Sequence, residues 1–253
     1  MKISIITAVL NRKNEIEETL ESLKNQTYRN IQHIIIDGGS TDGTLDILKN
    51  YKSTVKDYEI ILMSEKDKGL YNALNKGVSL ATGEIIGILH AGDLFAHNKV
   101  LEKVVNSFKE KNFIDGVYGD VEFFNESGKT VRISKLGDFD YKKILIGWHP
   151  THPTLFLRKY VYDNLGFYRE DFDIASDYEF ILRVILKGKY KLFYLNEILV
   201  KMRTGGKSGQ SPRKFIKKFI EDWKIVKEYN LPFYTVLLKK LIKISEILRV
   251  FKI

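Results

Sequence analysis

Short apolar runs alternate with amphipathic segments through the first half of the chain. Runs rich in β-branched residues, typical of buried strands, cover residues 2–8, 31–37, 58–63 and 84–89. Apolar residues at helical spacing predict helices over residues 14–25, 41–51, 70–80 and 97–109. Strands that alternate with helices predict right-handed crossovers and a parallel α/β sheet.

The pattern changes in the second half. Residues 116–124 and 129–134 have the pattern of a β-hairpin, followed by a short strand over 154–157. A helix over 175–187 and a strand over 190–195 complete the pattern, so this half is expected to extend the sheet and form a second wall of the cleft. Two amphipathic helices, at about 213–229 and 232–252, then end the chain.

Two of the predicted strands lead into acidic residues. Asp37 ends one strand and is followed by two glycines and by small hydroxyl residues that can cap the next helix. Asp93 follows the strand over 84–89 through a short turn that contains Gly92. Parallel sheets bind ligands at the carboxyl ends of their strands. The two acids are therefore either turn residues or carboxylates that hold one ligand between them, through a metal ion in the case of Asp93.

A single carboxylate is enough for a magnesium or manganese site when the substrate supplies phosphates. These ions prefer oxygen ligands and are held by one or two carboxylates plus substrate phosphates. His90 either joins Asp93 or makes a structural hydrogen bond. Asp67 lies just before the helix over 70–80 and Lys76 lies within it, and the two either cap and pack or face the same crevice.

Two further acids, Asp177 and Glu179, begin the helix predicted over 175–187. Acids at a helix start complement the helix dipole, which is a purely structural role. The alternative is a general base that removes a proton from an attacking hydroxyl. Side chains two residues apart on a helix diverge, so only one of the pair is expected to face a cleft.

Charge and composition restrict the chemistry and the classes of binding partner that this chain can have. The chain contains no cysteine, which excludes disulfides and thiolate chemistry. Its net charge of +9 lies in residues 201–253, which hold 14 Lys and Arg against 4 Asp and Glu, whereas the remaining residues are close to neutral. A neutral body argues against a nucleic-acid partner. No apolar run is long enough to span a bilayer and no secretory signal is apparent, so we expect a cytoplasmic protein.

The basic end of the chain has two interpretations. In the last helix, apolar residues including Leu237 and Leu241 gather on one side, while the opposite polar side is predicted to carry Lys239, Lys240, Lys243, Glu246 and Arg249. A basic amphipathic helix of this kind suits the surface of an anionic membrane, which would place the protein at the inner face of the plasma membrane through residues 213–253. The alternative is packing on the body or within a homo-oligomer, with Phe215, Phe219, Ile220, Trp223 and Val226 as the packed stripe.

The motifs, taken in order, resemble family 2 glycosyltransferases of GT-A fold. They comprise residues 5–12, 36–44, 67–69 with 75–77, 81–84, 91–93, 152–154, 165–167 and 177–179 with Arg183. The resemblance implies a Rossmann-like, mostly parallel central sheet flanked by helices, with a glycosyltransferase domain over residues 1–208. Its nucleotide-sugar-binding half is residues 1–111, its acceptor-binding half is residues 112–208, and residues 209–253 form the basic amphipathic tail.

The resemblance also implies roles for single residues. Donor contacts would come from Thr7, Val9, Asn11, Asp37, Asp67, Lys76 and Gly92. Asp93 would ligate a Mn²⁺ or Mg²⁺ ion that bridges the donor diphosphate, Asp177 would be the catalytic base, and His152 and Glu179 would lie on the acceptor side. Where many members have two adjacent acids this chain has Asp37-Gly38, and of the family's DXD-type motif it keeps only Asp93.

The implied activity is transfer of a hexose from a nucleotide-diphosphate sugar to an acceptor hydroxyl, with inversion. Family habit points to a glycan or lipid-linked acceptor in cell-surface polysaccharide or lipopolysaccharide assembly. The run over 203–208 is either a linker or a loop that brings Arg203 or Lys207 to the diphosphate. Two rival functions are a nucleotidyltransferase, which would usually carry a glycine-rich phosphate loop where residues 7–12 have none, and a non-catalytic nucleotide-sugar or polysaccharide-binding module.

Overall fold

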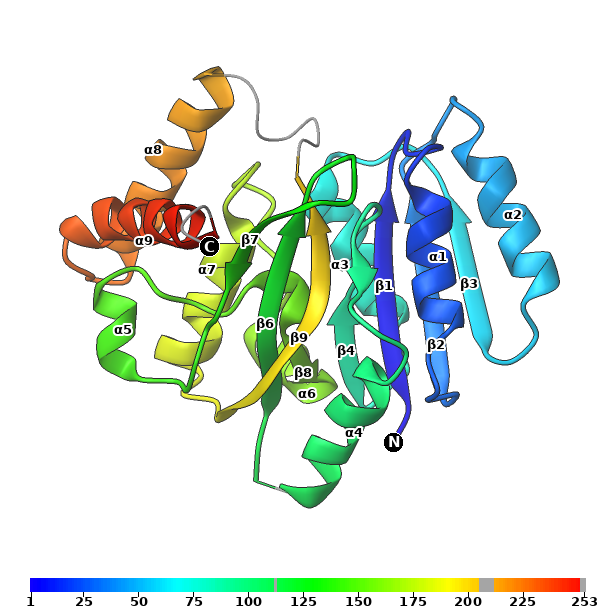
Figure 1. Cartoon of the computed structure of the whole chain (residues 1–253), viewed down its shortest axis with the longest axis horizontal. Helices are drawn as coiled ribbons and strands as arrows, with labels where there is room; N and C mark the ends of the chain where they lie inside the picture. The colour runs from blue at the N-terminus through cyan, green and yellow to red at the C-terminus, as the bar shows by residue number, and fades with distance from the viewer. Residues whose placement is uncertain (112, 205–211, 251–253) are drawn as a thin grey trace.

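A central sheet crosses the whole molecule. The computed structural model describes residues 1–111, 113–204 and 212–250, with side chains described as far as Ile242. Within these residues nine strands form one sheet in the order β3-β2-β1-β4-β8-β6-β9-β5, and β7 pairs with β6 (Figure 1). β3, β2, β1 and β4 are parallel, and β6 and β9 are also parallel, while β8 joins the two groups by antiparallel pairing with β4 and β6.

The elements follow the predicted alternation closely in the first half. The strands are β1 (Ile3–Val9), β2 (Ile31–Asp37), β3 (Glu59–Ser64), β4 (Ile85–Ile88), β5 (Leu94–Phe95), β6 (Gly116–Phe124), β7 (Thr130–Ser134), β8 (Phe156–Arg158) and β9 (Leu192–Arg203). The helices are α1 (Ile16–Lys24), α2 (Thr44–Thr54), α3 (Leu70–Leu80), α4 (Val100–Glu110), α5 (Tyr141–Leu145), α6 (Lys159–Leu165), α7 (Ser176–Leu182), α8 (Pro212–Glu228) and α9 (Tyr234–Val250).

Alternation along the strands produces two buried faces. In β1, Ile6 and Ala8 point toward one cluster, together with side chains of α3, α6 and α7, while Ile3 and Ile5 point toward another, with side chains of α1 and α4. Successive side chains of a strand point to opposite faces, so the seven buried residues of β1 cover both sides of the sheet. The result is a three-layer α/β arrangement whose strand ends are held rigidly.

Close packing of α3 on β1 requires a glycine. A Cβ atom built on Gly77 would lie 2.4 Å from Cγ2 of Ile6, well inside van der Waals contact. The missing side chain lets the helix approach the sheet, which sets the position of the loop that precedes α3. Asp67 and Gly69 belong to this loop.

The second half is less regular than predicted. The helix predicted over 175–187 is α7 followed by a π-helical turn at Arg183–Lys187, and β9 extends eight residues beyond the predicted end at residue 195. The short helices α5 and α6 and the two-residue β5 were not predicted. A 3₁₀ turn at His152–Thr154 immediately precedes β8.

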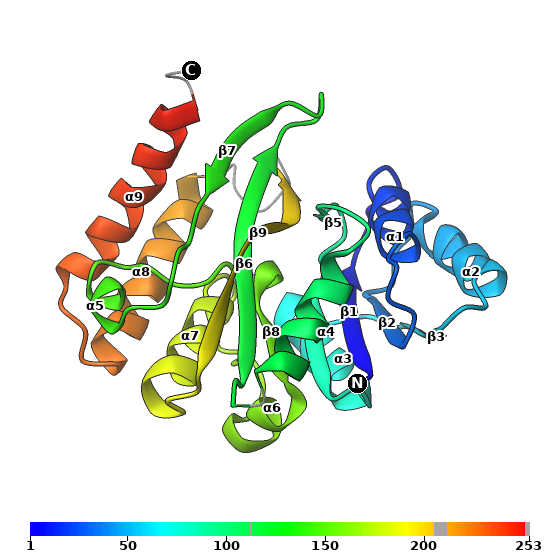
Figure 2. The same cartoon turned by 60° about the horizontal axis from the view of Figure 1, so that its bottom comes forward.

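The two C-terminal helices pack against the body at the end of the sheet opposite α1 and α2 (Figures 1 and 2). Ile225, Val226 and Val236 belong to the same buried cluster as α3 and α7. The Thr235 hydroxyl donates a hydrogen bond to the carbonyl of Leu145 over 2.7 Å. Residues 212–242 therefore share the core of the preceding residues.

The predicted packed stripe on α8 is only partly correct. Val226 is buried and Phe219 is partly buried, but Phe215, Ile220 and Trp223 are 62%, 46% and 42% exposed. The face of α8 toward the body instead contains Glu221, Asp222, Ile225 and Val226. In the parts of the chain that the structure describes, no helix is both long enough and apolar enough to cross a membrane.

Candidate functional site

The first wall of the site is the edge where β1, β2 and β4 end. Asp37, the last residue of β2, is fully buried and accepts hydrogen bonds from the Ser40 amide and from the Ser64 hydroxyl, the latter over 2.6 Å. The amide of Gly38 donates to the carbonyl of Val9 on β1 over 2.9 Å. These bonds fix the Asp37 carboxylate at the bottom of a turn rather than leaving it to rotate.

The loop after β1 is attached to the loop after β2. Asn11 has a positive φ of 52°, a conformation that asparagine tolerates better than most residues. Its amide donates to the Ser40 hydroxyl over 2.8 Å, and its side-chain oxygen accepts from the Thr41 amide over 2.9 Å. Thr7 lies deeper: its side chain is fully buried and its Oγ1 is 3.0 Å from Nε2 of His33. The structure thus places Asn11 at the sheet edge and the Thr7 side chain inside the core.

Asp67 and Lys76 form an ion pair beside this edge. The Lys76 ammonium is 2.5 Å from Asp67 and 2.7 Å from Glu65, and these carboxylates raise its pKa. A Cβ on Gly38 would lie 3.1 Å from Oδ2 of Asp67, so the Asp67 carboxylate adjoins the turn after Asp37. The predicted donor residues Asp37, Asp67 and Lys76 therefore lie together.

The turn between β4 and β5 positions Asp93. Gly92 has a φ of +100°, which side chains rarely adopt, and its amide donates to Thr19 of α1 over 2.9 Å. The Asp93 carboxylate is buried and accepts a hydrogen bond from the backbone amide of Arg203. Burial raises its pKa to about 7, against the opposing influence of that hydrogen bond and of the Arg12 and Arg203 guanidinium groups. Arg203 also pairs with Glu18, while Lys207 lies outside the described residues.

The surroundings of Asp93 fit a divalent cation that it shares with a substrate. Its Oδ2 atom is buried and has no hydrogen-bond partner among the described residues. An orphaned carboxylate oxygen is costly to bury, and a cation would satisfy it. Residues 1–111, 113–204 and 212–250 contain no cluster of three or more histidine or acidic side chains suited to a metal. Asp93 would hold the ion only if the substrate supplied further ligands, as a diphosphate can.

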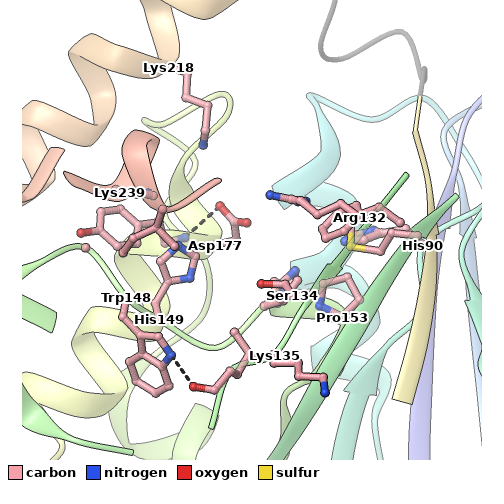
Figure 3. Close-up of a pocket in the computed structure, with 18 residues that line it drawn as sticks. His90, Arg132, Ser134, Lys135, Trp148, His149, Pro153, Asp177, Lys218 and Lys239 are labelled. Carbon is pink, nitrogen blue, oxygen red and sulfur yellow. Dashed lines mark hydrogen bonds between the residues drawn. The ribbon is translucent and has the colours of Figure 1, made fainter. Parts of the chain in front are cut away.

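The second wall of the site surrounds a cavity of about 290 Å³ next to this edge (Figure 3). Asp177, in the first turn of α7, lines it, and His90 connects it to the β4 end that leads to Asp93. The hydroxyl of Tyr71 lies 3.2 Å from Oδ1 of Asp177, and the Tyr178 amide donates to the same oxygen. The cavity is thus bounded by a carboxylate held by two donors.

The electrostatic surroundings keep Asp177 ionised. Burial alone would raise its pKa, but nearby positive groups outweigh burial and lower the pKa to about 2; these are Lys218, His152, Lys239 and His149. Burial also lowers the pKa of His152, so that imidazole is neutral near pH 7, and Lys218 makes the largest of the contributions that lower the pKa of Asp177. Asp177 is therefore a carboxylate able to accept a proton at neutral pH.

Two neighbouring histidines, the partly buried His90 and the buried His152, line the cavity. The rings of His90 and His152 lie 5.5 Å apart, and Nε2 of His152 is 2.8 Å from the Tyr168 hydroxyl. Burial, with a further contribution from His152, lowers the pKa of His90 to about 3. Both rings are neutral near pH 7 and can serve as hydrogen-bond partners for an uncharged hydroxyl.

Glu179 occupies a different environment from Asp177. It is buried away from the cavity lining, 2.8 Å from the Arg183 guanidinium, and it accepts a hydrogen bond from the Tyr229 hydroxyl over 2.7 Å. These contacts join α7 to the end of α8. The structure gives Glu179 a bracing position and places Asp177, two residues earlier, on the cavity.

Two cavity residues from the C-terminal helices were missed from the sequence. Lys218 of α8 and Lys239 of α9 line the cavity beside Asp177. The prediction that Lys239 lies on an exposed polar face is wrong: its side chain is 6% exposed, 3.0 Å from Asp222 and over the ring of Tyr178. The spacing of apolar residues in α9 gave no signal for this burial, because the partners come from α7 and α8.

The fold resembles that of known glycosyltransferases. The structure of S. aureus TarS 1–349 in complex with UDP-GlcNAc superposes with a TM-score of 0.69 at 19% identity, over 93% of this chain and 69% of that chain. The mannosyltransferase PcManGT from Pyrobaculum calidifontis, in complex with GDP-Man and Mn²⁺, gives 0.67 at 17% identity, over 96% of this chain and 74% of that one. These likenesses confirm the predicted GT-A type α/β fold.

Sequence comparison identifies the family. The profile described as Glycosyl transferase family 2 matches residues 4–171. A PGL/p-HBAD biosynthesis glycosyltransferase of Mycobacterium tuberculosis (strain ATCC 25177 / H37Ra) is 31% identical over 180 residues, which cover 71% of this chain and 68% of the relative. The chain belongs to glycosyl transferase family 2 and is a glycosyltransferase, as the motifs predicted.

Proposed function

We propose that the protein transfers a sugar from a nucleoside-diphosphate donor to an acceptor hydroxyl with inversion at the anomeric carbon. The observation that carries this proposal is the position of Asp177. This ionised carboxylate lines a cavity that His90 connects to the strand end leading to Asp93. A base on one side and diphosphate-binding groups on the other are the parts that a single displacement needs.

In the proposed reaction Asp177 accepts the proton of the acceptor hydroxyl as the hydroxyl oxygen attacks the anomeric carbon of the donor. The bond between that carbon and the diphosphate oxygen breaks, and the nucleoside diphosphate leaves with the electron pair. Such transfers pass through an oxocarbenium-like transition state. Asp37, Asp67 and Lys76 would orient the nucleotide and sugar of the donor, with Asn11 and Val9 shaping the same edge.

We assign Asp93 to a Mn²⁺ or Mg²⁺ ion shared with the donor diphosphate. When bound, such an ion acts as a Lewis acid that offsets the negative charge on the departing group. The orphaned oxygen of Asp93 and the adjacent guanidinium of Arg203 support this assignment. The mannosyltransferase PcManGT, which was solved in complex with Mn²⁺, supports it by analogy.

The biological setting is proposed from the relatives. The names of the mycobacterial relatives refer to PGL/p-HBAD biosynthesis, and the structural neighbours are complexes with UDP-GlcNAc and GDP-Man. We infer a glycan or lipid-linked acceptor and a role in building cell-surface glycans at the cytoplasmic face of the plasma membrane. A nucleotidyltransferase would instead release pyrophosphate from a nucleoside triphosphate, and a binding module would release nothing. Product analysis after incubation with donors distinguishes the three.

A thermal-shift screen of nucleotide sugars, with and without Mn²⁺, tests the donor side. At a ligand concentration 100 times Kd, binding to the native state alone stabilises a protein by about 2.7 kcal/mol. We expect at least one nucleotide sugar to raise the melting temperature, and more so with Mn²⁺. Asp67→Asn should reduce this shift, whereas Glu65→Gln, which alters the more exposed partner of the same lysine, should retain it. No shift with any nucleotide sugar would contradict the proposal.

We further propose that α8 and α9 present a docking face for an anionic lipid surface. Six apolar side chains on these helices are 42–62% exposed: Phe215, Ile216, Ile220 and Trp223 of α8, and Leu237 and Leu241 of α9. Basic residues surround them: Arg213, Lys214, Lys217, Lys224 and Lys227. Lys240 of α9 lies over the ring of Phe215, so the two helices adjoin at this face. Apolar side chains enter the interface, and each nearby basic residue adds about 1 kcal/mol of attraction to anionic lipid.

Vesicle flotation tests this face. We expect the full chain to float with anionic vesicles and to remain unbound with zwitterionic ones. The double variant Phe215→Ser/Ile216→Ser should lose flotation, while Phe113→Ser, which removes a 67% exposed ring elsewhere, should not. If the double variant floats normally but shifts the protein from dimer to monomer in sedimentation, the face is a homo-oligomer interface and the lipid proposal fails.

A further inference from the structure

The charged side chains that line the cavity beside Asp177 are mainly positive. Four of its described lining residues are lysine or arginine, namely Arg132, Lys135, Lys218 and Lys239, and one is a carboxylate, Asp177. They come from four different places in the chain: β7 and the residue following it, α7, α8 and α9. No local sequence feature accounts for the grouping, so the fold itself gathers these charges at one cavity.

Two of the cations converge on the base from the C-terminal helices. Lys239 is buried, with its ammonium 3.0 Å from Asp222 and 3.2 Å from the centre of the Tyr178 ring. Lys218 is 36% exposed and lies 3.9 Å from the same Asp222 oxygen. Burying a lysine costs several kcal/mol, which its partners must offset. The fold therefore keeps the Lys239 ammonium close to Asp177 despite the desolvation penalty of burying it.

The opposite wall supplies a guanidinium. Arg132 of β7 stacks on the ring of Phe123, 3.7 Å from the ring centre, and this contact fixes the plane of its side chain. Figure 3 shows Lys218 and Arg132 extending toward Asp177 from opposite sides of the cavity. A planar guanidinium and a mobile ammonium on facing walls are groups that proteins use to bind phosphate and carboxylate.

These cations work against the proposed reaction when the cavity is empty. They lower the basicity of Asp177, because positive charge nearby favours its ionised form. A neutral acceptor could accept hydrogen bonds from these groups but would gain no attraction from their charge, and its sugar ring would be bound by aromatic side chains such as Trp148. An anionic acceptor would use them for binding and, once bound, would offset their effect on the base.

We propose that the acceptor carries an oxyanion, a phosphate ester or a carboxylate, that is held between Lys218 and Arg132 next to the hydroxyl presented to Asp177. This inference rests on the proposed function, because it takes Asp177 as the base. Trp148, which lines the cavity and is only partly buried, would contact the apolar face of the acceptor sugar. The anion itself would restore part of the basicity that the lysines remove, so that proton transfer becomes favourable only with the acceptor in place.

The two tryptophans allow a direct binding test on the full-length protein. Trp148 lines the cavity and Trp223 lies on the outer surface of α8. In a Trp223→Phe background, fluorescence therefore reports from the cavity. We would titrate glucose, glucose 6-phosphate, glucuronic acid and inorganic phosphate at constant ionic strength without nucleotide sugar. The two anionic sugars serve as separate arms that distinguish phosphate from carboxylate recognition.

We expect at least one anionic sugar to bind about tenfold or more tightly than glucose, which corresponds to a difference of about 1.4 kcal/mol. Lys218→Gln and Arg132→Gln should remove most of that preference and leave glucose binding unchanged. Lys224→Gln, which removes a charge from the outer face of the same helix, is the matched control and should keep it. Circular dichroism melts would verify that each variant is folded.

Three results would overturn the inference: equal affinity for glucose and both anionic sugars, a preference that survives the Lys218 and Arg132 substitutions, or no saturable quenching by any probe. Binding is read without donor, metal or turnover. A protein that binds the anionic sugar but lacks donor binding and transfer would therefore refute the proposed function and not this acceptor site. A protein that binds the donor and transfers sugar, but does not prefer the anionic sugars, would refute the acceptor site alone.

Discussion

Asp177→Asn is expected to reduce sugar transfer by about 10²–10⁴-fold, the usual contribution of a positioned general base. The amide keeps the shape of the carboxylate but cannot accept the proton of the acceptor hydroxyl. Donor binding should be unchanged, because Asp37 and Asp67 lie outside the lining of the cavity that contains Asp177. Initial rates with saturating donor, together with the donor-induced thermal shift, measure the two effects separately.

Asp173→Asn is a suitable control for that variant. Asp173 lies four residues earlier, is 61% exposed on its side chain and pairs with Lys217 at the surface. Its replacement should leave transfer within about twofold of wild type, because an exposed ion pair contributes at most about 1 kcal/mol to stability. If Asp177→Asn retained near-normal rates, the base would have to be another group and the proposed mechanism would be wrong.

Asp93→Asn is expected to give an enzyme that is as stable as wild type or more so, yet loses its response to metal. The carboxylate is buried with one orphaned oxygen, so replacing it with a neutral amide removes a desolvation penalty. Without a negative ligand, the ion and the diphosphate would no longer be held together. Melting curves with nucleotide sugar, each with and without Mn²⁺, should show a difference for wild type and none for the variant.

Asp120→Asn provides the contrasting case. Asp120 is equally buried but satisfied, since it accepts hydrogen bonds from the Leu136 amide and the Tyr194 hydroxyl, both over 2.8 Å. Its replacement should lower stability by about 1–3 kcal/mol and keep the Mn²⁺-dependent shift. A metal response that persisted in Asp93→Asn would exclude Asp93 as the ligand.

Prediction from sequence succeeded where local pattern and packing agree. The bounds predicted for α3 are those observed, and the buried strand ending at Asp37 was predicted to the residue. Most of the buried positions in both segments carry apolar residues, so the local pattern and the packing agree. Most of the family motifs also lie in the first half, and three of the residues predicted there to contact the donor, Asp37, Asp67 and Lys76, lie together in the structure.

The failures have a common physical cause, which is dependence on distant partners. β5 has only two residues and exists because it pairs with β9 across the molecule. β9 was predicted too short because Asn196 and Glu197 interrupt its apolar pattern, and pairing with β6 carries the strand past them. Lys239 was predicted to be exposed because Asp222 and Tyr178, which accompany it in the interior, lie 17 and 61 positions away. The spacing of apolar residues predicts which side chains share a helix face, but it does not predict which other elements pack against that face.

The bonds made by Glu221 have a practical consequence for anyone who trims or recombines this enzyme. Both oxygens of its carboxylate receive backbone amides from Asp173, Ile174 and Ala175, the three residues just ahead of the helix that carries Asp177. A truncated version ending before α8 would retain every family motif. However, those three amides would lose their acceptor, and the turn before Asp177 would lose the contact that holds it in place. Chimeras that exchange acceptor specificity should therefore place their junction upstream of Asp173 and transplant everything after it as one piece.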